Sequence, residues 1–301
     1  MSNQIIVSIT TTPTRLSYLS SVIKSILQQT TKPDKIILNI PNKSKKSGKY
    51  YDIDLLKDYK NHPKILINRC EDYGPITKLI PTLYLDLSPD TLIVTVDDDI
   101  YLHPHTLSVI SRKSKIHTQQ VFSFSGICIG NFPFYWGLEA SNSHDKQVDV
   151  VEGVHSIVYR KWMVDAQELL DFRELLRSTL GDIVDCNDDH VISAYLSHKN
   201  ISKISINKRP KDYFFDLEHK NLGGISNRKL EFWLENIRIS SYLKKMGYYY
   251  CNVNPKSTIG LYIFLIPFLF KKPILLSLWI ILIYTILTTN IKLKTIKCQN
   301  L

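Results

Sequence analysis

The stretch LIVTVDDDI, residues 92–100, places three carboxylates directly after a short apolar run. A run of this length, rich in β-branched residues, is typical of a buried β-strand. Three adjacent carboxylates are costly to keep charged unless a cation or water compensates them; a divalent ion is the natural compensator, and oxygen ligands suit Mg²⁺ and Mn²⁺. Strand alternation turns the side chains of Asp97 and Asp99 in one direction and that of Asp98 in another. We therefore expect Asp97 and Asp99 to bind the metal. The alternative is a solvated acidic turn that caps a helix starting near Pro104.

Apolar strand patterns alternate with helical spacing through the first two thirds of the chain. Strands are predicted at residues 5–9, 35–40 and 64–67, and a helix at residues 16–27, with Pro13 placed to start it. This alternation predicts an α/β fold in which parallel strands are joined by crossover helices. Ligands of such folds gather at the carboxyl ends of the strands, so the polar segments that follow the strands are the candidate site.

Two further polar segments follow predicted strands. Residues 10–15, TTTPTR, offer hydroxyl groups, including that of Thr10, and the guanidinium of Arg15 where a nucleotide can lie. Residues 71–79, EDYGPITKL, form a Gly-Pro turn into a helix, and Lys78 adds a positive charge that suits a phosphate. Taken alone, the first segment is only a loop and the second is a capped helix with a solvated lysine.

A second acidic motif, residues 187–190 with the sequence NDDH, opens an apolar helix. One of its carboxylates, Asp189 or Asp188, is a candidate general base for an acceptor hydroxyl, and the alternative is a helix cap with a first-turn acid. Residues 152–153, Glu-Gly between two strand patterns, are candidate contacts for either sugar. His219 is a candidate metal or phosphate ligand, although a lone histidine is more often structural.

The composition excludes several classes of protein. With 44% hydrophobic and 22% charged residues among 301, the chain has ordinary globular usage, which excludes disorder, collagen and a disulfide scaffold. The net charge is +10, but the segment from Lys256 onward holds six lysines and no acidic residue, so we expect no nucleic-acid partner. The five cysteines are odd in number and form no CxxC pair, which favours a reducing compartment.

The C-terminal segment carries two apolar runs, residues 259–270 and 274–287, separated by a basic break. A spanning helix needs about 20 apolar residues, so the second run is marginal by itself. Four arrangements of these runs remain open. In the first, the second run spans the membrane after an interfacial helix; in the next two, the runs form a shallow hairpin or a pair of helices lying on the membrane; in the last, they are a buried helix pair that packs on the domain. We expect residues 1–255 to form a catalytic domain and residues 256–301 a membrane-associated tail. The amino terminus has no basic leader, so we expect the catalytic domain to face the cytosol.

Five segments occur in a fixed order along the chain: SITTTPTRL, DYGPITKLIPTL, IVTVDDDI, VDVVEGVHSIVYR and NDDHVISAYL. In this order they resemble glycosyltransferase-family-2-like enzymes over residues 5–206. The DDD triplet matches the family's acidic metal motif, GPITK resembles its GPATK turn, and NDDHVIS resembles its second acidic motif, often SDDIWIS. The resemblance implies the Rossmann-like fold called GT-A, a mixed and mainly parallel sheet flanked by helices.

The resemblance also implies an activity. A sugar would pass from a nucleotide-sugar donor, with a UDP-sugar favoured, to a hydroxyl of a glycan, lipid or protein acceptor. Mn²⁺ or Mg²⁺ would bridge Asp97 and Asp99 to the diphosphate, and Asp189 or Asp188 would be the base, so that direct displacement inverts the anomeric centre. The residues expected near the nucleotide and its phosphates are Thr10, Arg15, Lys78, Asp97 and Asp98.

The sequence departs from the family pattern at two places, and two rival functions remain. Residues 154–156, Val-His-Ser, replace the usual small, glycine-rich stretch, and His190 replaces the usual isoleucine. One rival is a nucleotidyl- or phosphotransferase that uses the same metal site. The other is a catalytically inert, membrane-tethered module that binds nucleotide sugars.

Overall fold

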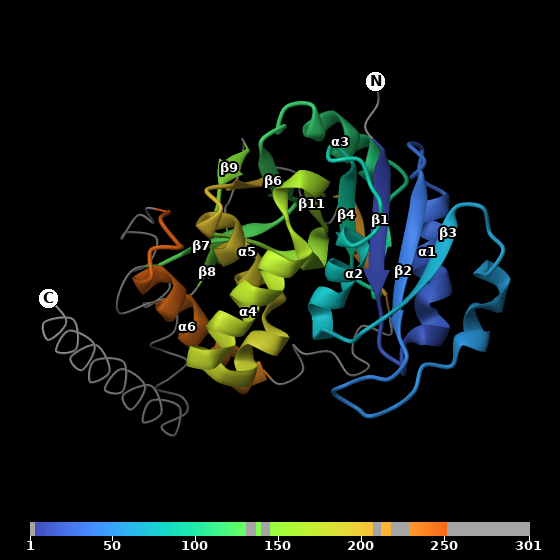
Figure 1. Cartoon of the computed structure of the whole chain (residues 1–301). Coiled ribbons are helices and arrows are strands. Elements are labelled where there is room, and N and C mark those ends of the chain that lie inside the picture. Colours follow the sequence, from blue (N-terminus) through green and yellow to red (C-terminus); the bar gives the residue numbers. More distant parts are fainter. Residues whose placement is uncertain (1–3, 131–136, 140–144, 207–211, 218–228, 252–301) are drawn as a thin grey trace, which may run out of the picture.

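A computed structural model describes residues 4–130, 137–139, 145–206, 212–217 and 229–251 (Figure 1). Within these ranges, no helix is both long enough and apolar enough to cross a membrane. The predicted tail, residues 256–301, lies outside the described residues, as does His219. The membrane association of the tail and the role of His219 therefore stay predictions.

An eight-stranded mixed sheet forms the centre of the fold, and its four N-terminal strands are parallel neighbours. The next strand in space, β11, runs antiparallel between β4 and β6, and β12 is parallel to β6. The predicted α/β fold with a mixed, mainly parallel sheet is confirmed, and the predicted strands match β1 to β4 to within three residues. In spatial order the strands are β3 (Ile65–Cys70), β2 (Lys35–Pro41), β1 (Ile5–Thr10), β4 (Leu92–Val96), β11 (Ile157–Arg160), β6 (Gln120–Ser123), β12 (Ser202–Ser205) and β9 (Lys146–Gln147).

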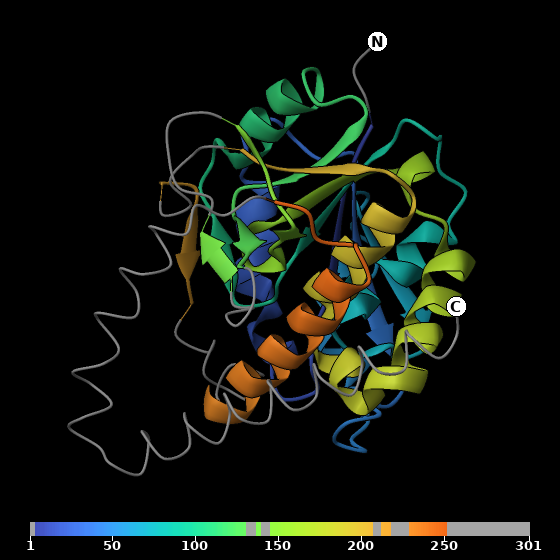
Figure 2. The same cartoon turned by 90° about the vertical axis from the view of Figure 1, so that its left-hand side faces the viewer.

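Two small sheets extend the central one. The first has three strands, β10 (Val150–Val151), β7 (Gly126–Ile129) and β8 (Gly137–Glu139). The second has two strands, β5 (Ile100–Leu102) and β13 (Phe214–Asp216). Helices lie on both faces of the central sheet (Figures 1 and 2). They are α1 (Leu19–Leu27), α2 (Ile80–Leu83), α3 (Thr106–Ser114), α4 (Ala166–Leu180), α5 (Asp188–His198) and α6 (Lys229–Lys245).

Within the described ranges, six short 3₁₀ helices connect these elements. The helix predicted for residues 16–27 is divided between the first of them, η1, and α1. The GPITK segment forms η3, a 3₁₀ helix that is followed by α2. The 3₁₀ helices are η1 (Leu16–Tyr18), η2 (Ile53–Tyr59), η3 (Gly74–Lys78), η4 (Gly153–His155), η5 (Lys161–Met163) and η6 (Gly181–Cys186).

Alternate residues of the central strands supply two hydrophobic cores, one on each face of the sheet. On one face, Ile93 of β4 joins a core that includes Leu169 of α4 and Ile192 of α5. On the other face, Val94 joins a core that includes Ile23 of α1. Burial of both faces explains why β4 is an uninterrupted apolar and β-branched run, with no exposed residue before its three carboxylates.

His190 is buried in the contact between α5 and the segment that follows α6. Its Nδ1 lies 2.8 Å from the hydroxyl of Tyr249, and the ring sits where the resembled family has isoleucine. Burial lowers the pKa of His190 to about 4, because the apolar surroundings disfavour the charged imidazolium. The folded protein therefore holds this imidazole neutral at a pH where the unfolded chain binds a proton.

The pKa of His190 predicts an acid-sensitive stability. Between pH 6.5 and about 4 the unfolded chain takes up a proton that the folded chain does not, so stability falls as pH falls through this window. We expect a loss of about 3 kcal/mol across it, which His190→Gln should remove. Denaturant unfolding from pH 7.5 to 4 measures this, with His105→Gln at an exposed histidine as the control. Parallel pH curves for the wild type and His190→Gln would contradict the prediction.

Candidate functional site

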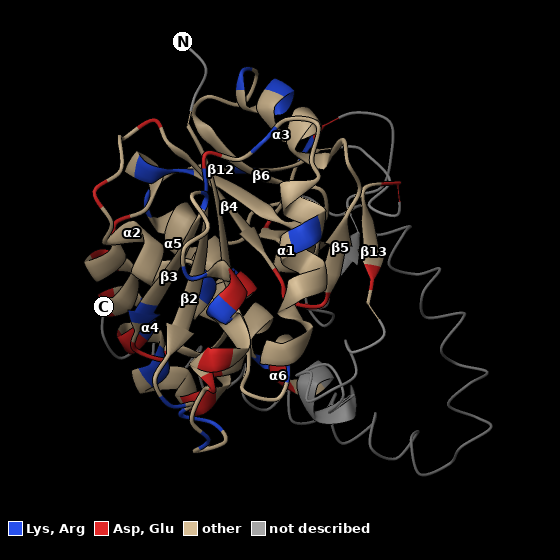
Figure 3. Cartoon of the chain, turned by 90° about the vertical axis from the view of Figure 1, so that its right-hand side faces the viewer, with Lys and Arg blue, Asp and Glu red and all other residues tan. Residues whose placement is uncertain are grey.

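Polar segments from four parts of the chain meet at the carboxyl ends of β1 and β4. Residues 97–99 follow β4 directly and form the acidic segment between β4 and β5 (Figure 3). Residues 11–15 follow β1, η3 contributes Lys78, and the start of α5 contributes the second acidic motif. The structure thus brings together the segments that sequence analysis selected separately.

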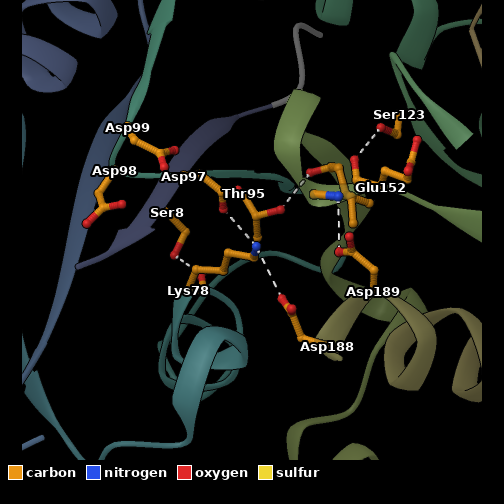
Figure 4. A network of polar contacts seen from close by, with 12 residues as sticks. Ser8, Lys78, Thr95, Asp97, Asp98, Asp99, Ser123, Glu152, Asp188 and Asp189 are labelled. Atoms are coloured by element: carbon orange, nitrogen blue, oxygen red, sulfur yellow. Dashed lines mark hydrogen bonds and ion pairs between the residues drawn. The ribbon is translucent and has the colours of Figure 1, made fainter. Parts of the chain in front are cut away.

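Lys78 lies at the centre of this arrangement (Figure 4). Its Nζ donates to Asp97 Oδ1 at 2.8 Å and lies 3.1 Å from Asp188 Oδ2. The side chain is only 6% exposed, so Lys78 is not the solvated lysine of the alternative interpretation. Burial alone lowers the pKa of Lys78, but the charges of Asp188, Asp97 and Asp189 outweigh burial and hold it well above the usual value. Lys78 is therefore a fixed positive charge between the two acidic motifs.

A buried hydrogen-bond network of Ser8, Asn39 and Thr82 holds the backbone of Lys78. Ser8 Oγ of β1 donates to the carbonyl oxygen of Lys78 at 2.5 Å and lies 2.6 Å from Thr82 Oγ1. Asn39 of β2 donates from Nδ2 to Ser8 Oγ and to Thr82 Oγ1, at 3.0 Å and 2.9 Å. Because Ser8, Asn39 and Thr82 are all buried, these bonds fix the end of η3 relative to the sheet.

Arg15 binds the other two carboxylates of the triplet. Its Nη1 lies 2.7 Å from Asp98 Oδ1 and 3.0 Å from Asp99 Oδ2. Thr11 Oγ1 donates to Asp98 Oδ2, so both oxygens of Asp98 have partners. Because β4 ends at Val96, strand alternation does not extend through the triplet, and the expected metal pair of Asp97 and Asp99 stays a prediction.

The remaining predicted nucleotide contact, Thr10, lies beside this group rather than in it. Its hydroxyl donates to the carbonyl oxygen of Asn39 at 2.9 Å, within the sheet. The neighbouring hydroxyl of Thr11, which sequence analysis did not single out, is the one that contacts the acidic triplet. The three threonines at residues 10–12 indicated that hydroxyl groups follow β1. The sequence pattern does not indicate which of these hydroxyls faces the site.

Asp189 is held by the backbone of Gly153. Its Oδ1 accepts a hydrogen bond from Gly153 N at 3.0 Å, and a Cβ at Gly153 would lie 2.8 Å from Lys78 Nζ and 2.9 Å from Asp189 Oδ1. A side chain at this position would have to displace the charged end of Lys78 or Asp189, which glycine avoids. Burial, followed by the negative charge of Asp188, raises the pKa of Asp189 well above the usual value. Residues 152–153 were predicted as sugar contacts, and Gly153 is found to support Asp189 directly.

The charge of the site suits a divalent cation. Five carboxylates, from the two acidic motifs, face two cationic side chains, Lys78 and Arg15. Burial, then the charges of Asp97 and Asp98, raises the pKa of Asp99 to about 6, which reflects this excess of negative charge. The oxygen donors fit Mg²⁺ or Mn²⁺. Among the described residues no three histidine, cysteine or acidic side chains are gathered tightly enough to hold an ion, so the metal stays a prediction.

Ser156 marks local strain beside the site. It links η4 to β11 with φ 62°, ψ 131°, a conformation that is unfavourable for a residue with a Cβ. The Ser156 Oγ is buried without a hydrogen-bond partner. The residue stands in the Val-His-Ser stretch that replaces the glycine-rich stretch of the resembled family, so this departure is accommodated by a strained backbone.

No protein-family profile matches the chain, and no curated protein matches it. Solved structures of S. aureus TarS are similar to it. TarS 1–349 in complex with UDP is 15% identical with a TM-score of 0.44, over 80% of this chain and 65% of that one. TarS 1–349 in complex with UDP-GlcNAc is 14% identical with a TM-score of 0.43, over 79% of this chain and 66% of that one. The function proposed below therefore rests on the geometry of the site.

The strain at Ser156 predicts a stabilising substitution. Ser156→Gly should raise the free energy of unfolding by about 1 kcal/mol, because relief of about 1–3 kcal/mol of strain exceeds the entropy that glycine adds to the unfolded chain. The lost hydroxyl costs no hydrogen bond. Denaturant unfolding at neutral pH measures the change. Gly74→Ala is the contrasting variant: its φ is 76° and its new Cβ would lie 2.9 Å from Asp185 O, so it should destabilise. A destabilised Ser156→Gly would show that the strain at Ser156 is smaller than the entropic cost of glycine, against the prediction.

Proposed function

We propose that the chain is a metal-dependent glycosyltransferase with a GT-A fold, which moves a sugar from a nucleotide-sugar donor to an acceptor hydroxyl. The observation that carries the proposal is the position of Lys78 between Asp97 and Asp188, within 2.8 Å and 3.1 Å of their oxygens. These carboxylates belong to the two acidic motifs, which are far apart in the sequence. A solvated acidic turn and a simple helix cap do not account for their meeting around a buried lysine.

The residues of the first acidic motif divide into two roles. Both oxygens of Asp98 are occupied by Arg15 and Thr11, so Asp98 orders the loop after β1. Asp97 and Asp99 each have one oxygen bound to a cationic side chain, and these two would hold Mn²⁺ or Mg²⁺. When bound, the cation supplies positive charge for the departing nucleoside diphosphate. Arg15 and Lys78 keep the carboxylates in place and add positive charge beside the phosphates.

Asp189 is the residue that fits the general base. Its carboxylate is oriented by Gly153 N, whereas Asp188 is held by Lys78. The raised pKa of Asp189 makes it a better proton acceptor than an exposed aspartate. Asp189 would take the proton of the acceptor hydroxyl while the acceptor oxygen attacks the anomeric carbon and the bond to the diphosphate breaks. Attack from the face opposite the leaving group inverts the anomeric centre.

A substitution of the base should separate chemistry from binding. Asp189→Asn should lower turnover by roughly 10²–10⁴-fold and leave donor affinity nearly unchanged, because a positioned base acts in the chemical step. Initial rates with a panel of nucleotide sugars and Mn²⁺ measure this, and Asp182→Asn, at a side chain that is 90% exposed, is the control. An inactive Asp188→Asn beside a fully active Asp189→Asn would exchange the two roles. Nucleotidyl transfer in place of sugar transfer would favour the rival enzyme, and binding without turnover the inert module.

The metal assignment has its own test. Asp99→Asn should abolish the part of nucleotide affinity that depends on Mn²⁺, and Asp98→Asn should have a smaller effect because Arg15 and Thr11 already occupy its oxygens. Calorimetric titration with UDP, with and without Mn²⁺, measures both. Asp90→Asn, at a side chain that is 75% exposed, is the matched control. Unchanged Mn²⁺-dependent affinity in Asp99→Asn would refute the metal site.

A further inference from the structure

Two side chains, Asp149 and Lys244, each bind the backbone of two segments that are distant in the sequence: the end of β7 and the segment after α6. None of these groups belongs to the proposed site. Buried Asp149 accepts from Ile129 N at 2.8 Å through Oδ2, and from Tyr250 N and Cys251 N at 2.7 Å and 2.9 Å through Oδ1. Lys244 Nζ of α6 donates to the carbonyl oxygens of Ile129 and Cys251, at 2.7 Å and 3.2 Å. One carboxylate and one ammonium group therefore hold the end of β7 beside the segment that follows α6 (Figure 1).

This arrangement brings two thiols together. Cys128 Sγ and Cys251 Sγ lie 3.7 Å and 3.6 Å from the same acceptor, the carbonyl oxygen of Gln147, which places both thiols around one oxygen atom. Both cysteines are partly exposed, so a small oxidant can reach them. The hydrogen bond from Cys251 lowers the pKa of Cys128, which makes Cys128 the better nucleophile of the two.

We propose that Cys128 and Cys251 form a reversible disulfide, with hydrogen peroxide as the oxidant. The Cys128 thiolate attacks one peroxide oxygen, the O–O bond breaks, and the released hydroxide takes up a proton, which leaves a sulfenic acid on Cys128. The Cys251 sulfur then attacks the Cys128 sulfur, the S–O bond breaks, and a second water leaves. Two thiols are oxidised by two electrons while one peroxide is reduced to two waters. Exchange with an external dithiol restores both thiols.

The disulfide would connect the end of the described chain, at Cys251, to β7. β7 pairs with β10 through Val150↔Ile127 and Val151↔Gly126, and β10 leads directly to Gly153. Cys251 is the last described residue before residues 252–301. In a reducing compartment a thiol pair of this kind acts as a redox-sensitive contact rather than as a permanent staple. This inference does not depend on the proposed enzymatic activity.

Peptide mapping of the full-length protein tests the proposal. After peroxide treatment, alkylation of the remaining thiols and digestion, mass spectrometry should find the Cys128 and Cys251 peptides linked, at a mass two hydrogens below their sum. Dithiothreitol should reverse the link. Cys128→Ser and Cys251→Ser should each abolish it, and Cys70→Ser, at the end of β3, should leave it intact.

A second measurement keeps the proposal testable if a serine variant does not fold. The oxidised wild-type protein should melt several degrees above the reduced protein, because the cross-link restricts the unfolded chain. Oxidation of Cys128 to sulfinic acid without a link would overturn the proposal. A link from either cysteine to Cys70, Cys186 or Cys298 in its place would also overturn it.

Discussion

The buried ammonium group of Lys78 is the constraint on which the rest of the site depends. A charge with 6% of its side chain exposed is tolerated only beside opposite charges, and Asp97 and Asp188 supply them. The sheet brings Asp97 to this point at the end of β4, and α5 brings Asp188 from the opposite part of the fold. The network of Ser8, Asn39 and Thr82 then fixes the lysine backbone, so both acidic motifs are located relative to one atom.

The features that could be predicted from sequence are those encoded locally. The uninterrupted apolar run of β4 and the helical spacing of α1 are periodic patterns, and they predicted the α/β class and the strands that carry the site. The two acidic motifs were also visible, because adjacent carboxylates at a strand end or a helix start are conspicuous. That they meet at Lys78 depends on tertiary packing, which the local pattern does not contain.

Other features of the site had no local signal. The partition of the triplet between Lys78 and Arg15 occurs beyond the end of β4 at Val96, where the strand pattern no longer predicts side-chain directions. The close packing of Asp189 and Lys78 against Gly153 brings together distant segments, so no local pattern around the glycine signals it. The strained backbone of Ser156 likewise follows from the path between η4 and β11 rather than from its side chain.

The core around α4 and α5 is built from segments that are far apart in the sequence, and this affects how the chain folds during its synthesis. This core takes side chains from Ile76 and Leu79 near the start of the fold and from Leu243 and Tyr249 at the end of the described residues. During translation it cannot close until Tyr249 has left the ribosome, so the face of α5 that carries His190 stays uncovered until then. A nascent chain that stops short of Tyr249 therefore leaves apolar surface of this core exposed to water.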